Sequence, residues 1–287
     1  MAFAARDGFD VLGTYRTEPG PAAGSVDLMR CDLSQPGAPD QLFADRRIDT
    51  VIHAAAALSG SNDSTFMRRA ARDNITGHSE VLTAAIAAGC RRFIFCSTIS
   101  IYEGVEPKDS AGWREDDAVR PNNVYGWSKL AGEELLRLAC IESPELRAVS
   151  LRLAGIHGPG KTGGIVRNAA RAAMQGETLK ISDTQSRFRL VFVDDAIAAI
   201  EAAIGQGTDQ GYDCYNVAGE EIFTLPELVL AMGRVLGNTV ALDSAGDGPT
   251  RDRVMTIDRV KSDLSFRPRA LDRNLADTVA WLRQNPS

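Results

Sequence analysis

Tyr125 and Lys129 are four residues apart, a spacing that places both on one face of a helix about 6 Å apart along its axis. A free phenol titrates near ~10, and an ammonium ~4 Å away at an effective dielectric of ~20 favours its ionised form by roughly 4 kcal/mol, or about three pKa units. Such a phenol can act as a general acid or base near neutral pH. We therefore expect a proton-transfer pair, with an ordinary exposed helix surface as the alternative.

Two hydroxyl residues upstream can complete this pair. The apolar run Arg-Phe-Ile-Phe-Cys over residues 92–96 ends in Ser97 and Thr98, which is typical of a parallel strand buried on both faces. Ligands of open α/β sheets bind at the carboxyl ends of the strands. A hydroxyl there can hydrogen-bond a substrate oxygen while Tyr125 moves its proton. The alternative is that Ser97 and Thr98 only cap a turn.

The elements that must position these residues alternate in the first half of the chain. We expect strands at 10–15, 27–33, 50–55, 91–97 and 148–153, and helices at 66–88 and 123–140. This order predicts an α/β fold with a doubly wound, Rossmann-like parallel sheet. After residue 160 the alternation of strand-like and helix-like stretches becomes less regular, which predicts a smaller C-terminal α/β lobe. We assign 1–155 to a dinucleotide-binding domain and 156–287 mainly to a substrate-binding lobe, with 190–220 returning to the core.

Local signals mark several helix ends. Asn122 or Asn123 is expected to cap the helix that carries Tyr125. Thr224 and Glu227 form a capping box. The last helix is expected at 271–284, with Trp281 on its apolar side.

Composition excludes several classes of protein. The 287 residues carry a net charge of −6 without a basic cluster, so nucleic acid is not expected as a partner. The five cysteines form no Cys-x-x-Cys pair, which predicts buried reduced thiols and no metal site. No apolar stretch approaches the ~20 residues of a membrane span, and the N-terminus lacks a signal peptide pattern. We therefore expect a cytoplasmic protein without a membrane partner.

Several motifs occur together in one order. They are Asp32-Leu33, Val51-Ile52-His53-Ala54-Ala55, Asn74-Ile75-Thr76-Gly77, Ser97-Thr98, Tyr125 to Lys129, Arg152 to Gly160, and the tail from Asp258 to Leu282. This ordered set, which spans nearly the whole chain, resembles the extended short-chain dehydrogenase/reductase family, the NAD(P)-dependent epimerase/dehydratase group.

The resemblance implies roles for individual residues. Tyr125 would be the proton donor or acceptor, Lys129 its pKa partner and a ligand of the nicotinamide ribose, and Thr98 the catalytic hydroxyl. His53 is expected to be a strand-end residue rather than a base. The residues that would contact the cofactor are Arg16, Asp32, Leu33, Ala54, Ala55, Ala56, Asn74, Ser97, Tyr125, Lys129 and Ala154. Thr98, Arg187 and Arg189 would contact the substrate, although exposed arginines are often only solvated surface.

Three departures from the family pattern refine the expectation. Ile99 and Ser100 stand where dehydratases of nucleotide sugars carry an Asp-Glu pair, so a 4,6-dehydratase is not expected. Gly155 replaces an asparagine that contacts substrate phosphates, which weakens a UDP-sugar assignment. The second strand ends in Arg16 rather than in an acidic residue, which favours NADP over NAD, with Glu18 as a counter-signal.

The family's glycine-rich turn and the strand before it are lacking ahead of residues 8–11, and residues 1–6 resemble the end of the following helix. In the strand order 3-2-1-4-5-6 this loss leaves two interior strands unpaired, with a gap of ~4.8 Å on each side, and removes the phosphate-binding helix N-terminus. A start codon assigned too far downstream, a degenerate truncated product and a protein that has given up cofactor binding are the three explanations. We favour the first.

These observations predict an NAD(P)-dependent oxidoreductase or epimerase that acts on a hydroxyl/ketone pair of a sugar-like or small polar substrate. The alternatives are a non-catalytic dinucleotide sensor, an inactive truncated member of the family, and an inert scaffold. The resemblance also implies a homodimer that pairs the helices at 66–88 and 123–140 across a two-fold axis.

Overall fold

The computed structural model describes residues 8–19, 26–181, 183–206, 211–244 and 250–285, so the helix expected at residues 1–6 lies outside the described residues. The chain divides into two compact units. Unit 1 comprises residues 1–106, 118–152 and 199–215, and unit 2 comprises residues 107–117, 153–198 and 216–287. The segment 199–215 of unit 1 falls within the range expected to return to the core. The roles expected for 1–155 and 156–287 stay predictions.

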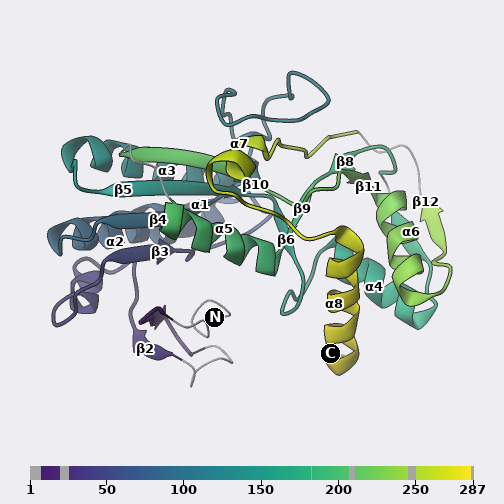
Figure 1. Ribbon diagram of the computed structural model, residues 1–287, viewed down its shortest axis with the longest axis horizontal. Coiled ribbons are helices and arrows are strands. Elements are labelled where there is room, and N and C mark those ends of the chain that lie inside the picture. Colours follow the sequence, from purple (N-terminus) through teal and green to yellow (C-terminus); the bar gives the residue numbers. More distant parts are fainter. Residues whose placement is uncertain (1–7, 20–25, 182, 207–210, 245–249, 286–287) are drawn as a thin grey trace. The chain divides into compact units, whose positions relative to one another are not determined.

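A four-stranded sheet forms the centre of unit 1, in the order β10-β5-β4-β3 (Figure 1). Its strands are β3 (Thr50–His53), β4 (Arg92–Thr98), β5 (Arg147–Leu153) and β10 (Tyr212–Val217). Strands β3 and β4 are parallel, with Val51 opposite Phe93. Six of the seven residues of β4 are buried, as expected for an apolar strand covered on both faces.

Two further strands of unit 1 form a separate parallel pair. They are β1 (Leu12–Tyr15) and β2 (Asp27–Arg30), and neither joins the four-stranded sheet. Among the described residues, no strand pairs with the outer edge of β3. The sheet is therefore divided where the sequence predicts a strand to be lacking. An ion pair of 3.1 Å from Arg16 to Asp73 ties the two-stranded pair to the rest of unit 1.

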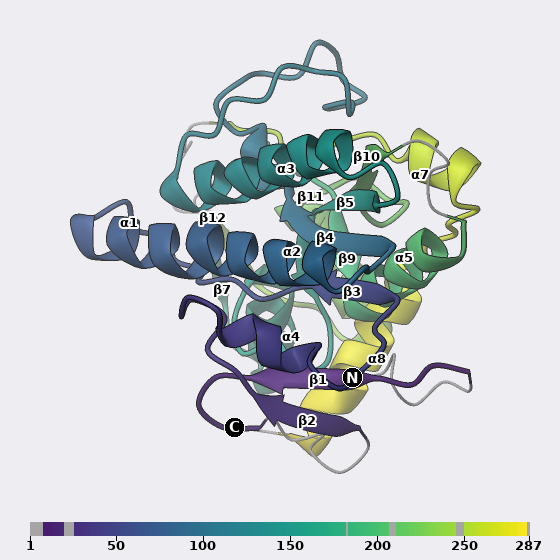
Figure 2. The ribbon, with the colours of Figure 1, turned by 90° about the vertical axis from the view of Figure 1, so that its left-hand side faces the viewer.

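The helix expected at 66–88 is longer and has three parts. Helix α1 (Ser64–Ala70) begins after Asp63, whose carboxylate accepts the N–H of Phe66 at 2.8 Å. A π-helical turn (Ala71–Thr76) and helix α2 (Gly77–Ala87) follow without a break. Figure 2 shows α1 and α2 as one rod with α3 beside it. Such π-helical turns often occur at functional sites, and this one contains the buried Asn74.

Helix α3 (Val124–Glu142) carries the predicted catalytic pair. Its N-cap is Asn123, whose side chain accepts the N–H of Gly126 at 2.7 Å, which confirms the predicted cap. Helices α2 and α3 pack on the same face of β4, where Leu82, Leu136 and Phe95 share one apolar cluster. Gly132 lies so close to the Phe95 ring that an added Cβ would be 2.7 Å from its Cζ atom.

Unit 2 consists of short paired strands and helices. Strand β6 (Gly155–His157) is parallel to β9 (Leu190–Phe192), β7 (Leu179–Ile181) is parallel to β12 (Leu242–Ser244), and β8 (Arg187–Phe188) is antiparallel to β11 (Phe223–Thr224). The helices are α4 (Ile165–Gln175), α6 (Leu225–Leu236), α7 (Asp258–Asp263) and α8 (Leu271–Gln284), while α5 (Val193–Gln206) continues into unit 1. Helices α4, α6 and α8 share a core.

Several local predictions for unit 2 are confirmed. Thr224 and Glu227 form both hydrogen bonds of a capping box at the start of α6. The last helix has the predicted bounds, and Trp281 packs against the apolar core of the unit. In the described part of the chain, no helix is long and apolar enough to cross a membrane.

The contact between α3 and β4 can be tested with two glycine substitutions. Replacement of glycine by alanine in a helix usually raises helix propensity, and Gly205 of α5 has open space around it. We expect Gly132→Ala to lower the free energy of unfolding by about 1–3 kcal/mol, because the buried Phe95 ring cannot move away. Gly205→Ala, the matched control, should raise it by about 0.5 kcal/mol or leave it unchanged. Urea unfolding measures both values, and equal effects would contradict the packing described.

Candidate functional site

The predicted catalytic residues come together in unit 1. Thr98 ends β4, and its hydroxyl is near enough to the phenol of Tyr125, in the first turn of α3, to lower the pKa of that phenol. The Thr98 oxygen accepts the N–H of Ser100 at 3.2 Å, which orients the side chain. Lys129 follows one helical turn after Tyr125. The catalytic role of these three residues stays a prediction.

The Lys129 side chain points into the interior. It is 2% exposed, and its ammonium lies 4.0 Å from the centre of the Phe95 ring. Burial lowers the pKa of Lys129 to about 8, against the influence of Cys96 and Glu133, which raise it. Lys129 is therefore an unusually weak base that keeps its proton at neutral pH.

The expected effect of Lys129 on Tyr125 is not found. Burial raises the pKa of the Tyr125 phenol above its ordinary value, and the neighbouring Cys96 raises it further, while the Thr98 hydroxyl lowers it. The expectation that the helix spacing makes this phenol acidic is therefore wrong in direction for the protein itself. The physical reason is that the Lys129 ammonium turns towards the Phe95 ring, and that desolvation outweighs other influences on the phenol.

Asn74 links the loop after β3 to the catalytic helix. Its side-chain oxygen accepts the N–H of Ala57 at 2.6 Å, and its amide donates to the carbonyl of Ala57 at 2.9 Å and to the Ser128 hydroxyl at 2.9 Å. Ser128 in turn donates to the carbonyl of Tyr125 at 2.8 Å. Asn74 therefore fixes the loop and α3 relative to each other.

Residues near the ends of β2 and β3 fit a dinucleotide. Ala54, Ala55 and Ala56 are exposed directly after β3, and their small side chains leave the backbone open to a flat ligand. Asp32 follows β2, and hydrogen bonds from the Ser34 hydroxyl and N–H lower the pKa of its carboxyl group and keep it ionised. These features suit the ribose and adenine of a dinucleotide.

Other expected cofactor residues are engaged within the chain. Ser97 is buried, and its hydroxyl donates to Glu133 rather than to solvent. Leu33 packs against the core beneath α2. The Arg16 guanidinium pairs with Asp73, so it is not a free anchor for a 2′-phosphate. Ala154 follows β5 in unit 2, where it is buried and its N–H donates to the carbonyl of Val217 at 2.9 Å.

His53 ends β3 as expected, but its side chain is buried in the core and its Nε2 atom has no hydrogen-bond partner there. It is 4% exposed and stacks on the Phe95 ring, with 5.8 Å between ring centres. Burial holds the pKa of His53 well below its ordinary value, so the ring is neutral at physiological pH. Four of the five cysteines are buried as expected, Cys214 is half-buried, and all five are free thiols. No cluster of metal ligands occurs in the portion of the chain that the structure describes.

The two arginines expected to contact substrate are held by unit 2 itself. The Arg187 guanidinium pairs with Asp252 and also donates to the carbonyl of Ser110 at 3.1 Å. Arg189 donates to the carbonyls of Met255 and Glu220, each at 2.9 Å. Neither side chain lines the cavity found in the same unit.

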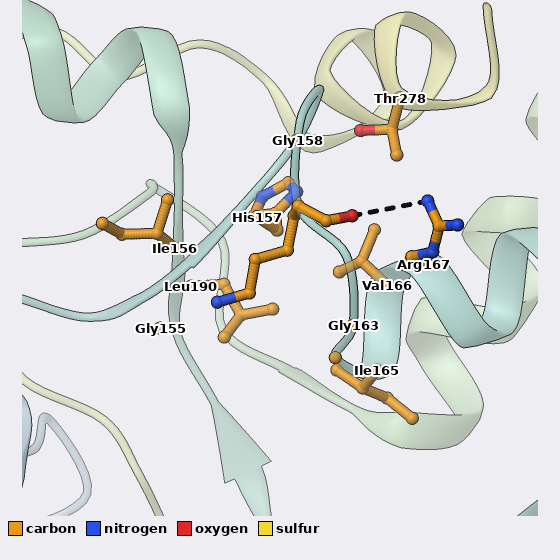
Figure 3. A pocket seen from close by; sticks show the side chains of 12 residues that line it. Gly155, Ile156, His157, Gly158, Gly163, Ile165, Val166, Arg167, Leu190 and Thr278 are labelled. Carbon is orange, nitrogen blue, oxygen red and sulfur yellow. Dashed lines mark hydrogen bonds between the residues drawn. The ribbon is translucent and has the colours of Figure 1, made fainter. Parts of the chain in front are cut away.

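This cavity of unit 2 has a volume of about 210 Å³ (Figure 3). It is lined by Gly155, Ile156, His157, Gly158, Lys161, Gly163, Gly164, Ile165, Val166, Arg167, Leu190 and Thr278. Its walls are mainly apolar, with Lys161 and Arg167 as the cations. The His157 Nδ1 atom is buried without a partner, and burial lowers the pKa of this ring to about 4. The cavity can therefore accept an anionic or polar group beside an apolar one.

Sequence reasoning missed the cavity and the buried partners of the catalytic helix. The glycine-rich stretch 155–164 was a visible signal for a turn that lines a site, but it did not indicate that Arg167 and Thr278 join it. Glu133 stands four residues after Lys129, so the helical period alone places it on the catalytic face. Ile99 is buried and Ser100 follows it, so no carboxylate comes directly after Thr98.

Comparison with known proteins agrees with this geometry. The chain matches the NAD dependent epimerase/dehydratase family over residues 1–218. It is 28% identical to dTDP-glucose 4,6-dehydratase of Streptomyces griseus over 251 residues, which are 83% of this chain and 73% of that enzyme. It is 26% identical to UDP-glucose 4-epimerase of Erwinia amylovora over 269 residues, which are 85% of this chain and 79% of that enzyme.

A solved structure of MoeE5 in complex with UDP-glucose and NAD is similar at a TM-score of 0.81 and 27% identity, covering 97% of this chain and 92% of that one. The expected dinucleotide cofactor and Rossmann-like fold are thereby confirmed, while the preference for NADP stays a prediction. This chain belongs to the NAD dependent epimerase/dehydratase family, within the extended short-chain dehydrogenases/reductases, as its ordered motifs predicted.

Proposed function

We propose that this protein is an NAD(P)-dependent epimerase or oxidoreductase that acts on a hydroxyl/ketone pair of a sugar nucleotide or a related polar sugar. One observation carries the proposal. At the carboxyl end of β4 the Thr98 hydroxyl is near enough to the Tyr125 phenol to lower its pKa, with Lys129 one helical turn away. The family and its members with sugar-nucleotide substrates give independent support.

The chain's own residues manage the proton of the reacting oxygen. Nicotinamide supplies the hydride chemistry when the dinucleotide is bound. Because its pKa is raised, the Tyr125 phenol carries its proton at neutral pH and is set to donate it to a ketone oxygen. The Thr98 hydroxyl fixes that oxygen by hydrogen bond. In the oxidative direction Tyr125 must first give up its proton.

A defined set of residues would hold the dinucleotide. Asp32 and Leu33 would lie beside the adenine end, and the exposed Ala54 to Ala56 along its length. Tyr125 and Lys129 would contact the nicotinamide ribose. Asn74 would act through the loop that it fixes, since its side chain is fully used by Ala57 and Ser128.

The cavity of unit 2, taken by itself, has groups that suit the binding of a polar, charged ligand. Lys161 and Arg167 provide cationic groups for a phosphate or carboxylate, and Ile156, Val166 and Leu190 provide an apolar wall. Gly155 lines this cavity where UDP-sugar enzymes usually carry an asparagine, so we do not assign a particular nucleotide. The absence of an Asp-Glu pair after Thr98 favours epimerisation or simple oxidation over dehydration.

A dimer is also consistent with the surface of unit 1. Large apolar side chains are exposed on α3, at Trp127, Leu138 and Ile141, and on α1 at Met67. Helices α1, α2 and α3 are the elements expected to pair across a two-fold axis. Association would remove these side chains from water, which is favourable in proportion to the apolar area covered.

A family member without turnover is the alternative to this proposal. A strand between β1 and β3 would bring the phosphate-binding turn of a Rossmann fold, and the described residues contain no strand that pairs with either edge. Binding of NAD without turnover would support a dinucleotide sensor. Failure to bind either dinucleotide would support an inert scaffold.

The proposed reaction can be tested through Tyr125. Tyr125→Phe removes the phenolic hydroxyl that moves the proton of the substrate oxygen. We expect this change to lower kcat/KM by about 10²–10⁴-fold. Binding of NAD, followed by tryptophan fluorescence, should change little. Chromatography of reaction mixtures containing NAD⁺ and either UDP-glucose or dTDP-glucose measures the turnover.

Tyr215→Phe is the matched control, because Tyr215 is also buried and hydrogen-bonded, in its case to Asp213 at 3.2 Å. This variant should turn over like the wild type. Unchanged turnover in Tyr125→Phe would refute the assignment of Tyr125 as the proton-transfer residue.

The role of the cavity can be tested through α4. Arg167→Gln should weaken substrate binding about tenfold, the effect of one lost charge-assisted hydrogen bond, with little change in kcat. Arg171→Gln, on an exposed face of the same helix, is the control and should leave KM unchanged. A fall in kcat at constant KM for Arg167→Gln would contradict a role in binding alone.

A further inference from the structure

Two of the three histidines of the chain meet in the core of unit 1. His53 ends β3 and His78 lies in the first turn of α2, and the centres of their rings are 5.1 Å apart. Phe93 and Phe95 of β4 line the space around them, and the centre of the Phe95 ring is 4.5 Å from that of His78. His53 is 4% exposed and His78 is fully buried. The two imidazoles therefore join α2 to the sheet.

This pair lacks the hydrogen bonds that buried polar side chains usually make. The Nε2 atom of His53 and both ring nitrogens of His78 are buried without a hydrogen-bond partner. Unpaired polar atoms are uncommon in protein interiors and costly, and an apolar side chain of similar volume would pack here without that cost. Packing alone therefore does not account for two histidines at these positions.

A proton added to either ring would become a second buried cation. Lys129 of α3 already acts on both rings as a positive charge, and its ammonium lies 4.0 Å from the centre of the Phe95 ring. The Cys96 thiol of β4 is neutral at physiological pH, because burial raises its pKa. The carboxylate of Glu133 in α3 is paired with Arg152. An imidazolium at this place would therefore be desolvated and repelled by the nearby ammonium.

The stability that depends on this pair varies with pH in a definite direction. Burial lowers the pKa of His78 to about 3 and that of His53 well below the ordinary value of 6.5, and Lys129 lowers both further. The backbone of Gly132 raises the pKa of His78 but does not outweigh burial. The unfolded chain therefore binds protons that the folded chain does not. The stability is complete above about pH 6.5 and is lost as the pH falls below that value.

We propose that His53 and His78 form an acid-sensitive contact, whose protonation in mildly acidic solution releases α2 from β3 and β4. The contact adjoins residues expected to hold the dinucleotide, since Ala54 follows His53 directly and Asn74 lies four residues before His78. Acid would therefore loosen the loop after β3 together with the helix that fixes it. The consequence for dinucleotide binding rests on the proposed function, whereas the effect on the fold does not.

The test is the pH dependence of unfolding in urea, followed by the amide NMR signals of α2 and β4. Each histidine that is neutral in the folded chain should raise the equilibrium constant of unfolding about tenfold between about pH 7.5 and about pH 5.5. The variant His53→Leu/His78→Leu keeps apolar side chains of similar volume and removes both titrating rings. We expect the rise between these two pH values to be about 100-fold smaller in this variant than in the wild type.

Phe93→Leu is the matched control, because Phe93 belongs to the same cluster but does not titrate. The centre of its ring lies 6.2 Å from that of His53 and 5.6 Å from that of His78. This variant should raise the equilibrium constant of unfolding by a similar factor at each pH and leave the pH dependence unchanged. Equal pH dependence in the wild type and in His53→Leu/His78→Leu would overturn the proposal.

If the double variant does not fold, NMR signals of the imidazole rings in the wild type decide. The chain has three histidines, so single substitutions assign their signals. Rings of His53 and His78 that stay neutral until unit 1 unfolds would support the proposal. Titration of either ring near its ordinary pKa of about 6.5 in the folded protein would overturn it. Both measurements use the full chain without substrate or dinucleotide, so their outcome does not depend on turnover.

Discussion

The close packing of α3 against β4 is the constraint on which the site depends. Gly132 lies against the Phe95 ring, and at Gly126 an added Cβ would be 2.6 Å from the carbonyl oxygen of Ser100. Without side chains at these two positions, the helix approaches the strand end closely enough for the Tyr125 phenol to meet the Thr98 hydroxyl. A larger residue at either glycine would push away the surface that carries the catalytic residues, since well-packed interiors have little free volume.

Two buried polar networks fix this helix from opposite sides. Asn74 bonds the loop after β3 and reaches the backbone of Tyr125 through Ser128. Glu133 reaches β5 through Arg152. Each network holds polar atoms that would be costly to bury unpaired, so each permits few alternative positions of the helix. The stretch of α3 from Tyr125 to Lys129 is therefore fixed both in its position along the helix axis and in its rotation about that axis.

The features that could be predicted from the sequence are helix caps and helix bounds, which depend on local and periodic patterns. The cap at Asn123, the capping box at Thr224 and the last helix depend on contacts within a few residues, so their patterns are visible in the chain itself. The direction of the Lys129 side chain could not be predicted, because the Phe95 ring that attracts it belongs to another element. The same reason hid the partner of Glu133 and the cavity of unit 2, whose lining comes from stretches more than 100 residues apart. A π-helical turn at 71–76 has no residue signature at all.

The division of the sheet affects proton transfer and the binding of the dinucleotide differently. β4 is buried along almost its whole length, whereas Thr50, Val51 and Ile52 of β3 are half-exposed although two of them are apolar. That exposure lies where the outer edge of β3 has no neighbour among the described strands. The groups that handle the proton make their contacts with β4, β5 and the helices, and none of these contacts requires a strand beyond β3. Proton-transfer geometry can therefore be complete in this fold while the binding of dinucleotide phosphates depends on what covers that edge.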